Sequence, residues 1–363
     1  MNSILKQLLE PKSFQSFIDE NMKTSTYKAN WKNEISDIEY CAAKVYQAKI
    51  AEYSAAMVGS VISKNGERPV HKMPDINELM GSIGHIGDEW ELDNDYLDQL
   101  HYLEGRYRDR AGRSYTQAQQ NEQYDKLIEF TFRPFNKAVI APHKRIDMLY
   151  FEGLYKGTQT VSRTNNVKAN VSYTFNLDIE QISAAKNWGG EDATPFIDIK
   201  SLKDAAKKKG RKILKIRMSE NTFYKMCQAK EVKDTFKLNL GTLQVNPSVP
   251  IISVDQMNVY LRSIMLPTIQ IDEDMYVTLA DGKNVNLIPD DRVVAQCAER
   301  VAVMKVSDPL ELVDPLPGKT YSSYDDNLVG YWRDKTGYHI TNDMWAQPVF
   351  NGINDYYILK TGA

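Results

Sequence analysis

The sequence contains few of the residues that build disulfide frameworks and metal sites. Its 363 residues include only three cysteines and five histidines. The cysteines form no CxxC pair and are odd in number, so they predict no disulfide framework and fit a reducing compartment. No two histidines have the spacing of HxH, HxxxH or HExxH. These absences argue against a zinc ribbon and a small secreted protein.

Long apolar runs and an excess of one charge are also missing. No stretch approaches the length of a membrane span, and the opening residues MNSILKQLLEPKSF lack the apolar core of a signal peptide. We therefore expect a soluble, intracellular chain that contacts no membrane. The 45 Lys and Arg residues nearly balance the 48 Asp and Glu residues. A net charge of −3 argues against condensation of nucleic acid by bulk charge.

Sequence signatures of catalysis and ligand binding are absent as well. There is no GxSxG elbow, and the segment GSIGHIG at residues 81–87 matches neither GxGxxG nor a phosphate-binding loop. The acidic residues 272–274 lack the glycine and glutamate of a calcium loop. Adjacent carboxylates in extended chain point to opposite faces, so we interpret Asp290-Asp291 and Asp325-Asp326 as turn formers.

The first 30 residues carry short helical stripes of apolar residues, interrupted by Pro11. The stripes consist of Ile4, Leu5, Leu8 and Leu9, followed by Phe14 and Phe17. A segment of this length is too small to fold alone. It either packs on its own domain or forms an arm that lies on a neighbouring subunit.

A β-hairpin is predicted near residues 57–72. Val58, Val61 and Ile62 precede the pair Asn65-Gly66, which suits a type I′ turn. Pro69 limits strand pairing on the return side, so the hairpin should be an extended excursion. It is either a surface hairpin or a loop that reaches onto another copy of the chain.

A long helix is predicted from Asn121 to Leu154, because apolar residues recur there at steps of three and four. Pro134 and Pro142 should kink or divide it, and we expect a long, bent helix. The opposite face is a solvated surface or a contact surface for acidic neighbours or nucleic acid. It carries Lys126, Arg133, Lys137, Lys144 and Arg145.

The chain after Gly157 predicts β-like runs and then a helix, a strand and a second helix. Leu214, Ile216 and Met218 alternate with Lys215 and Arg217, which marks the strand. Ser219 or Asn221 can cap the next helix, which places Cys227 at a core position. We interpret Cys227 as a buried structural thiol, since no histidine lies in the same segment.

Three more local signals complete the α+β prediction. The basic run at residues 207–212 contains Gly210 and lacks stacking aromatics, so it indicates a solvated helix end more than a nucleic-acid patch. Asp281-Gly282 predicts a second hairpin. The chain from Val301 onward alternates apolar and polar residues and should supply strands.

No catalytic set emerges from these patterns, so the chain is expected to be no enzyme and to bind no cofactor or metal. The alternative from a different functional class is a cytosolic enzyme with a site assembled from dispersed residues such as His143, Asp147 and Glu152. These three residues lie on one predicted helix but not on one face of it.

The order of these parts resembles the major capsid proteins of tailed bacteriophages, which share the HK97-like fold, and among them the branch that includes the phage lambda capsid protein. The resemblance lies mostly between residues 55 and 295. It is carried by VGSVISKNGERPVHKMP, APHKRIDMLYFEGLYKGTQTVS, ILKIRMSENTFYKMCQAKEVKDTF and VNLIPDDRVV.

The resemblance implies a domain layout and a set of contacts between subunits. Residues 1–45 would be an N-terminal arm, 46–92 the extended loop, 93–190 the peripheral domain with its spine helix, 191–300 the axial domain, and 301–363 the C-terminal strands that complete the peripheral domain. The implied intersubunit contacts include Leu5, Leu8, Lys64, Asn65 and Gly66.

The resemblance also implies a function. Copies of the chain would form hexamers and pentamers of an icosahedral shell around double-stranded DNA, in the host cytoplasm during assembly and then in the virion. A separate scaffolding protein, a portal, decoration proteins and non-specifically contacted DNA would be the partners. No Lys–Asn crosslink is predicted, because no asparagine partner for Lys64 is identifiable. An encapsulin-like nanocompartment shell is the alternative with the same fold.

Overall fold

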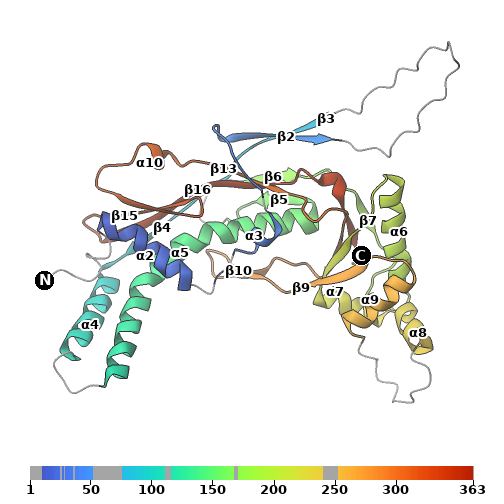
Figure 1. Cartoon of the computed structure of the whole chain (residues 1–363), viewed down its shortest axis with the longest axis horizontal. Coiled ribbons are helices and arrows are strands. Elements are labelled where there is room, and N and C mark those ends of the chain that lie inside the picture. The colour runs from blue at the N-terminus through green and yellow to red at the C-terminus, as the bar shows by residue number, and fades with distance from the viewer. Residues whose placement is uncertain are drawn as a thin grey trace, which may run out of the picture. The chain divides into compact units, whose positions relative to one another are not determined.

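The computed structural model describes residues 10–24, 27, 29–35, 37–51, 76–110, 116–166, 171–239 and 252–362. The chain divides into two compact units, each built from separate stretches of sequence. Unit 1 comprises Met1–Tyr46, Gly81–Asp147 and Met304–Pro348, and unit 2 comprises Gln47–Met80, Met148–Val303 and Val349–Ala363. Each unit contains a sheet with helices, which confirms the predicted α+β class (Figure 1).

Unit 1 is built on a six-stranded sheet with the order β1-β13-β16-β15-β14, in which β4 also pairs with β16. β1 runs parallel to β13, whereas β14, β15, β16 and β4 form antiparallel pairs. The strands are β1 (Ile38–Tyr40), β4 (His85–Leu92), β13 (Val303–Ser307), β14 (Thr320–Tyr324), β15 (Asn327–Arg333) and β16 (Tyr338–Val349).

Asp325 and Asp326 form the two-residue connection between β14 and β15. Their φ angles are 50° and 61°, as a type I′ turn requires at both positions. Asn and Asp tolerate this left-handed region better than most residues. The prediction that this pair forms a turn is confirmed.

The helices of unit 1 pack their aromatic residues into one core. The core includes Phe14, Phe17, Leu100, Leu127 and Phe135, together with Val329 and Ile340 of the sheet. The helices are α2 (Pro11–Thr24), α3 (Trp31–Glu34), α4 (Asn94–Arg110), the part of α5 (Gln117–Lys156) up to Asp147, and α10 (Leu310–Val313).

The predicted long helix exists as α5, which has 40 residues and begins earlier than expected. Pro134 and Pro142 both lie inside it and do not divide it. Figure 1 shows α5 as one bent helix, in keeping with the backbone hydrogen bonds that each proline removes. Lys126, Arg133 and Lys137 are exposed on this helix.

Unit 2 contains a five-stranded sheet with the order β7-β17-β12-β8-β9. The two outer pairs, β7/β17 and β8/β9, are parallel, and the inner pairs are antiparallel. The strands are β7 (Gln181–Ser183), β8 (Lys215–Ser219), β9 (Thr268–Asp272), β12 (Arg292–Gln296) and β17 (Tyr356–Lys360). The last strand, β17, therefore belongs to this sheet and not to that of unit 1.

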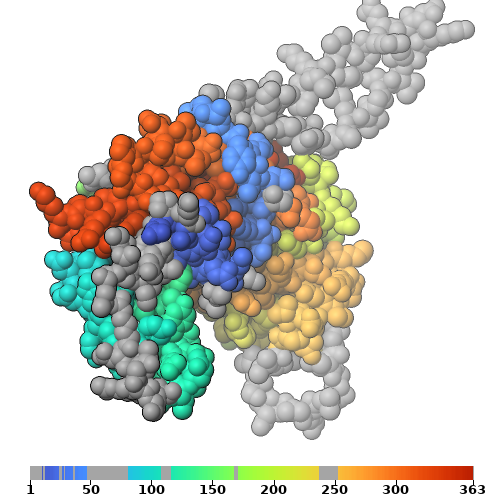
Figure 2. Space-filling view, turned by 60° about the vertical axis from the view of Figure 1, so that its left-hand side comes forward, coloured from blue at the N-terminus to red at the C-terminus, as the bar shows by residue number. Residues whose placement is uncertain are grey.

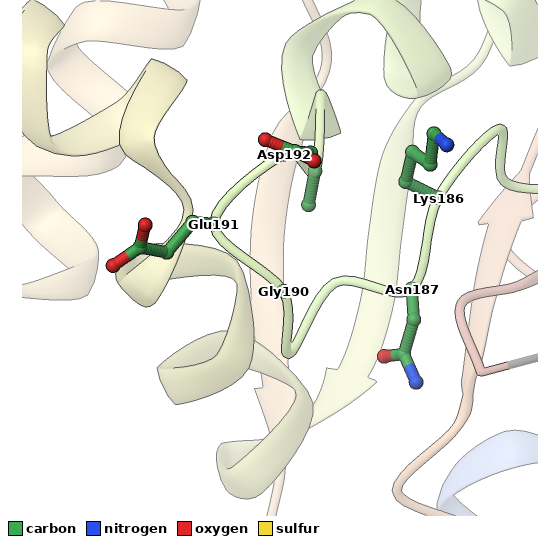
Figure 3. Close-up of a pocket in the computed structure, with 6 residues that line it drawn as sticks. Lys186, Asn187, Gly190, Glu191 and Asp192 are labelled. Atoms are coloured by element: carbon green, nitrogen blue, oxygen red, sulfur yellow. The ribbon is translucent and has the colours of Figure 1, made fainter.

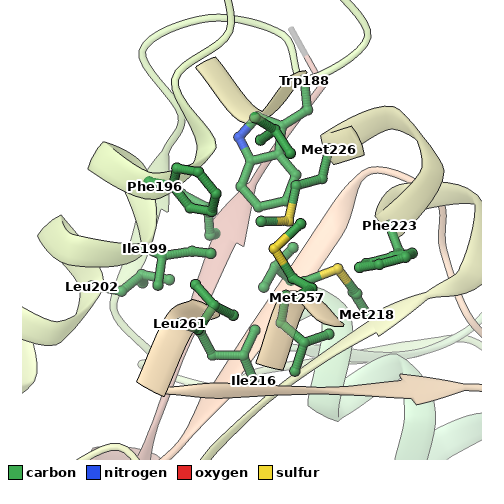
Figure 4. Close-up of a cluster of buried hydrophobic side chains, with 14 of the residues drawn as sticks. Trp188, Phe196, Ile199, Leu202, Ile216, Met218, Phe223, Met226, Met257 and Leu261 are labelled. Carbon is green, nitrogen blue, oxygen red and sulfur yellow. The ribbon is translucent and has the colours of Figure 1, made fainter. Parts of the chain in front are cut away.

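The helices of unit 2 enclose a core that is rich in methionine. Met218, Met226 and Met257 meet beside Trp188 and Phe196, and all of these side chains are buried (Figure 4). The buried Asp198 accepts a hydrogen bond of 2.9 Å from the Trp188 indole. The helices are α6 (Pro195–Lys208), α7 (Glu220–Gln228), α8 (Lys230–Asn239) and α9 (Val254–Ser263).

The strand β8 differs from its predicted alternation. Ile216 and Met218 are buried as expected, but Arg217 is buried as well. β8 lies between β12 and β9, and the Arg217 guanidinium donates to the Asp272 carboxylate at 2.8 Å. The alternation in the sequence did not reveal this burial, because the ion partner that makes it possible lies on the neighbouring strand.

The other predicted features of unit 2 are confirmed in most respects. The Ser219 hydroxyl accepts from the Thr222 N–H and caps α7, and Cys227 is buried. β10 (Tyr276–Thr278) and β11 (Asn284–Asn286) form the predicted hairpin. Gly282 has a φ of 84° but Asp281 has no positive φ, so the turn is not of type I′.

Two further pairs of strands lie outside the large sheets. β5 (Thr158–Val161) pairs with β6 (Tyr173–Asn176) in unit 2. β2 (Val45–Ala51) pairs with β3 (Ile76–Ser82), and these strands flank the region of the predicted extended loop.

Candidate assembly surfaces

The residues predicted to contact other subunits lie outside the described part of the chain. Leu5 and Leu8 precede residue 10, and Lys64, Asn65 and Gly66 fall between β2 and β3. Their role in assembly therefore stays a prediction. The surfaces described below belong to the described residues.

The described N-terminal helix packs on its own unit. The ring of Phe17 stacks on Phe132 at a centroid distance of 4.0 Å, and Phe14 contacts Phe135 edge to face at 5.8 Å. Such aromatic pairs add to the stabilisation that comes from burying their surface. Of the two alternatives for the first residues, the packing of α2 on its own domain is thus observed, and contact of the opening segment with a neighbouring subunit stays a prediction.

A side chain of α2 also closes one edge of the sheet. The Gln15 amide nitrogen donates to the Ser323 carbonyl at 2.8 Å, and its oxygen accepts from the Ser323 N–H at 3.0 Å. The same oxygen accepts from the Ser322 hydroxyl. β14 is the last strand in the sheet order, so Gln15 satisfies backbone groups that an edge strand leaves open.

The short helix α3 is anchored on α5 through Asp147. The Asp147 carboxylate accepts from the Trp31 backbone N–H at 2.7 Å and from the Tyr27 hydroxyl at 3.2 Å. The ring of His143, one turn earlier on α5, stacks on the Trp31 ring at 6.0 Å. Lys32 of α3 also forms an ion pair with Asp325 in the β14–β15 turn.

Burial shifts the ionisation of this anchor. Burial raises the pKa of Asp147 to about 6, against the opposing effect of its hydrogen bonds. Burial lowers the pKa of His143 to about 4. Both ring nitrogens of His143 and the indole nitrogen of Trp31 are buried without a hydrogen-bond partner among the described residues. Unpaired buried polar atoms of this kind cost stability.

The dispersed active site considered above is not assembled. His143 and Asp147 are both buried, and Asp147 is engaged by the N-terminal segment. The Glu152 carboxylate accepts from the Thr160 N–H at 2.9 Å and pairs with Lys156. Within the described residues, no hydrogen bond joins these three side chains to one another.

Burial also raises the pKa values of two thiols in unit 2. It raises the pKa of Cys227 to about 11 and that of Cys297 to about 11. A thiol that stays protonated at neutral pH is a poor nucleophile. The interpretation of Cys227 as a structural residue is confirmed by its burial in the core.

One group of exposed apolar side chains in unit 1 lies on the segment around α10. None of the residues of α10 is buried, and Val313 is 76% exposed. Three acidic residues, Asp308, Glu311 and Asp314, alternate with the apolar ones. Lys319 ties the segment back by an ion pair with Glu311 and lies over the Trp332 ring at 4.2 Å. The exposed apolar residues are Leu310, Leu312, Val313 and Leu316.

Unit 2 exposes a second apolar group at the end of α9. Met265 is 78% exposed and holds a positive φ of 58°, a conformation that non-glycine residues seldom adopt. The Lys203 ammonium donates to its carbonyl oxygen at 2.5 Å, which fixes this loop against α6. Ile264, next to Met265 in the sequence, and Val259 of α9 are also exposed. Exposed apolar groups of this kind are typical of surfaces that contact other molecules.

The basic run at residues 207–212 is a helix end, as predicted. Gly210 has a φ of 71°, and its N–H donates to the Lys207 carbonyl. The Arg211 N–H donates to the Ala206 carbonyl, which completes a Schellman motif. The cations are engaged in part within the unit, since Lys209 pairs with Glu180 and Arg211 with Asp355.

The adjacent carboxylates Asp290 and Asp291 act separately. Asp290 accepts from the Ser219 hydroxyl at 2.7 Å and from the Asn221 amide at 2.9 Å, next to the start of α7. Asp291 instead pairs with the neighbouring Arg292. The prediction that these two carboxylates do not grip one ligand is consistent with this division.

A depression in unit 2 is lined by the loop that precedes α6. Figure 3 shows that the side chains of Lys186, Asn187, Glu191 and Asp192 point in different directions. Ligand sites place a few polar groups so that they converge on one position. The depression therefore lacks the geometry of a small-molecule site.

The described residues contain neither a metal-binding cluster nor a membrane-spanning helix. No group of three or more His, Cys, Asp or Glu side chains there could hold a metal ion. No helix in that part of the chain is long and apolar enough to cross a membrane.

No family model and no curated protein matches the chain. Solved structures do match. A crystal structure assigned to a prophage capsid protein from E. coli CFT073 matches with a TM-score of 0.56 and 12% identity, over 97% of this chain and 99% of that chain. The capsid of cyanophage A-1(L) matches with a TM-score of 0.48 and 13% identity, over 93% and 94%. A phage-related protein from Bordetella bronchiseptica matches with a TM-score of 0.47 and 10% identity, over 95% and 96%.

The similarity to the prophage protein extends over nearly the full length of both chains, and it establishes the fold. The chain has the HK97-like α+β fold that the sequence resemblance implied. It thus shares its architecture with a protein assigned to a phage capsid.

Proposed function

We propose that the chain is the major capsid protein of a tailed bacteriophage. The observation that carries this proposal is the fold shared with the prophage capsid protein over 97% of this chain. Copies would associate into hexamers and pentamers, and these would close into an icosahedral head around double-stranded DNA. Contacts that close into rings give such shells, and the chain would be located in the virion.

The surfaces of the two units support an assembling protein. Each unit exposes apolar side chains, around α10 in unit 1 and at the end of α9 in unit 2. The described residues bring together neither a metal cluster nor a convergent pocket. Burying exposed apolar surface on other copies links the stability of a subunit to that of the shell.

The predicted domain layout becomes part of the proposal. Residues 93–190 would form the peripheral domain around α5, and residues 191–300 the axial domain at the symmetry axes. Residues 46–92 would reach over an adjacent subunit, with Lys64, Asn65 and Gly66 at the contact, and residues 1–45 would be the arm with Leu5 and Leu8. Residues 301–363 would supply the C-terminal strands.

The proposed partners follow from the same function. A separate scaffolding protein would guide assembly in the host cytoplasm, and a portal would occupy one vertex. Decoration proteins would bind the outer surface. DNA would contact the shell non-specifically, which suits a chain with a net charge of only −3.

Expression with and without the scaffold tests the proposal. Size-exclusion chromatography with light scattering and electron microscopy should show rings or closed shells. A stable monomer at high concentration, even with the scaffold present, would overturn it. Shells that enclose an enzyme, encoded beside this chain in a host genome, would instead identify a nanocompartment.

A further inference from the structure

The exposed face of α4 carries a short, regular stripe of side chains. Asp98, Tyr102 and Arg106 follow one another at steps of four residues, which places them on one face of the helix. All three are exposed, and Tyr102 is 63% exposed. The Arg106 guanidinium lies 5.7 Å from the centre of the Tyr102 ring. A large aromatic side chain is thus held in solvent between opposite charges.

The other face of α4 is fixed to α5. Tyr96 stacks on Phe130 at 4.6 Å, and its hydroxyl donates to the Phe130 carbonyl at 2.9 Å. Leu100 is fully buried between the helices. Figure 2 shows α4 in cyan beside the start of α5 in green at the surface of unit 1. The stripe is therefore presented from a supported helix.

The charges of the stripe are complementary to a second copy of the same stripe. Asp98 lies four residues before Tyr102 and Arg106 lies four residues after it. In an antiparallel pair of α4 helices with a two-fold axis at Tyr102, each Asp98 faces Arg106 of the partner subunit. An isologous contact of this kind is self-complementary by symmetry. Asp98 has no ion partner within the described residues.

Gly105 supplies a second observation. A glycine inside a helix destabilises it relative to alanine. A Cβ atom at Gly105 would meet nothing within 4 Å among the described residues, so no packing within that part of the subunit explains the glycine. Gly105 lies one turn from Tyr102 on the same side of α4. A small residue there lets another helix approach closely, next to the ring of Tyr102.

We propose that α4 pairs antiparallel with α4 of a second copy of this chain, with Tyr102 at the two-fold axis and Asp98 paired with Arg106 across it. The contact would be one of the contacts between subunits of the proposed shell, so its role in assembly rests on the proposed function. Two short helices bury less surface than a stable interface needs, so the contact is weak alone. In a shell, other contacts raise the effective concentration of the two helices.

Disulfide capture tests the axis. In Tyr102→Cys, the two new thiols of a pair should lie within disulfide range, because the same residue meets itself at a two-fold axis. Mild oxidation should give covalent dimers, measured by non-reducing electrophoresis. The unmodified chain controls for Cys41, Cys227 and Cys297. Tyr276→Cys is a matched control, since Tyr276 is also exposed, at 61%, but lies on unit 2.

Charge reversal in the Tyr102→Cys chain tests the pairing. Asp98→Arg and Arg106→Asp should each lower the yield of dimer about tenfold, because like charges then meet across the axis. The double change Asp98→Arg with Arg106→Asp should restore it. The two positions are two turns apart on one helix, so a contact within the subunit cannot produce this rescue. If circular dichroism shows that a charge reversal disturbs folding, the neutral substitutions Asp98→Asn and Arg106→Gln are used in its place.

The outcomes separate this inference from the proposed function. Particles that assemble without Tyr102→Cys dimers would overturn the α4 contact and leave the capsid proposal intact. Dimers at high protein concentration without particles would support the contact and contradict the capsid proposal. The inference would be overturned if neither particles nor dimers formed. It would also be overturned if the yield of dimers did not depend on the charges of residues 98 and 106.

Discussion

Each unit contains a buried charged or titratable cluster, and the two clusters differ in how well their polar atoms are paired. In unit 2, the Arg217 guanidinium and the Asp272 carboxylate are paired, and the Tyr155 hydroxyl also donates to Asp272. In unit 1, Asp147 is paired, but the ring nitrogens of His143 and the Trp31 indole have no hydrogen-bond partner among the described residues. Equal burial therefore has different consequences, because pairing decides its energetic cost. The anchor of α3 should be weaker than the centre of the unit 2 sheet.

The largest effect is expected at the paired cluster. Asp272→Ala removes the carboxylate that accepts from the buried Arg217 guanidinium, which should lower the free energy of unfolding by about 3–5 kcal/mol. Urea denaturation followed by circular dichroism measures the loss. The double change Arg217→Met with Asp272→Leu is the control and should recover most of it, since a buried ion pair is often replaceable by apolar residues. A loss below about 1 kcal/mol for Asp272→Ala would contradict the importance of the pair.

A smaller effect is expected at the α3 anchor. Asp147→Ala removes the acceptor for the Trp31 N–H and the Tyr27 hydroxyl, which should cost about 1–3 kcal/mol. The loss should be local, so limited proteolysis should cut near residues 27–35 sooner than in the unmodified chain. Glu152→Ala, on the same helix, should leave this cleavage rate unchanged. An unchanged rate in Asp147→Ala would show that stacking alone holds α3.

A gain in stability is expected at His143. His143→Phe keeps a ring beside Trp31 and removes two buried nitrogens that have no partner among the described residues, so the free energy of unfolding should rise by about 1 kcal/mol. Thermal unfolding measures the change. A phenyl ring is larger than imidazole and overpacking would offset part of the gain, so His143→Leu, which is closer to histidine in volume, is the control. A clear loss of stability in both variants would show that the imidazole nitrogens have partners.

The smallest effect is expected from pH in the unmodified anchor. Burial lowers the pKa of His143 to about 4, so stability falls as the pH drops below its unfolded value of 6.5. Burial raises the pKa of Asp147 to about 6, so its contribution rises as the pH drops from there toward 3.8. The two contributions oppose each other between about pH 4 and 6.

Removing one partner should expose the contribution of the other. Asp147→Asn should make acid more destabilising than in the unmodified chain, because only the histidine contribution remains. His143→Phe should make acid less destabilising, because only the carboxyl contribution remains. Melting temperatures at about pH 4.5 and pH 7 measure both slopes. Parallel slopes in the two variants would contradict the opposed titrations.

Local features of the fold were predictable from the sequence. The helical period found α5, and the local chemistry of Ser219 and Gly210 marked one helix start and one helix end. Each of these features depends on residues a few positions apart. For the same reason, Asp325-Asp326 could be identified as a turn before its strands were known.

Features that depend on distant partners were missed. Arg217 is inward because Asp272, 55 residues later, receives it. β17 joins the unit 2 sheet, and no local pattern records which sheet a strand enters. The α10 surface was missed because four residues between prolines show no helical period. The alternating apolar and acidic residues of PLELVDPLP were the available signal.

The side-chain amide of Gln15 takes the place of a neighbouring strand's peptide group at β14, because a primary amide offers a donor and an acceptor just as the main chain does. An N-terminal truncation that removes Gln15 would expose the backbone of β14, and strands of other molecules could then pair with this edge of the sheet. A shortened chain intended for crystallisation should therefore keep Gln15, since its loss is expected to favour fibrils.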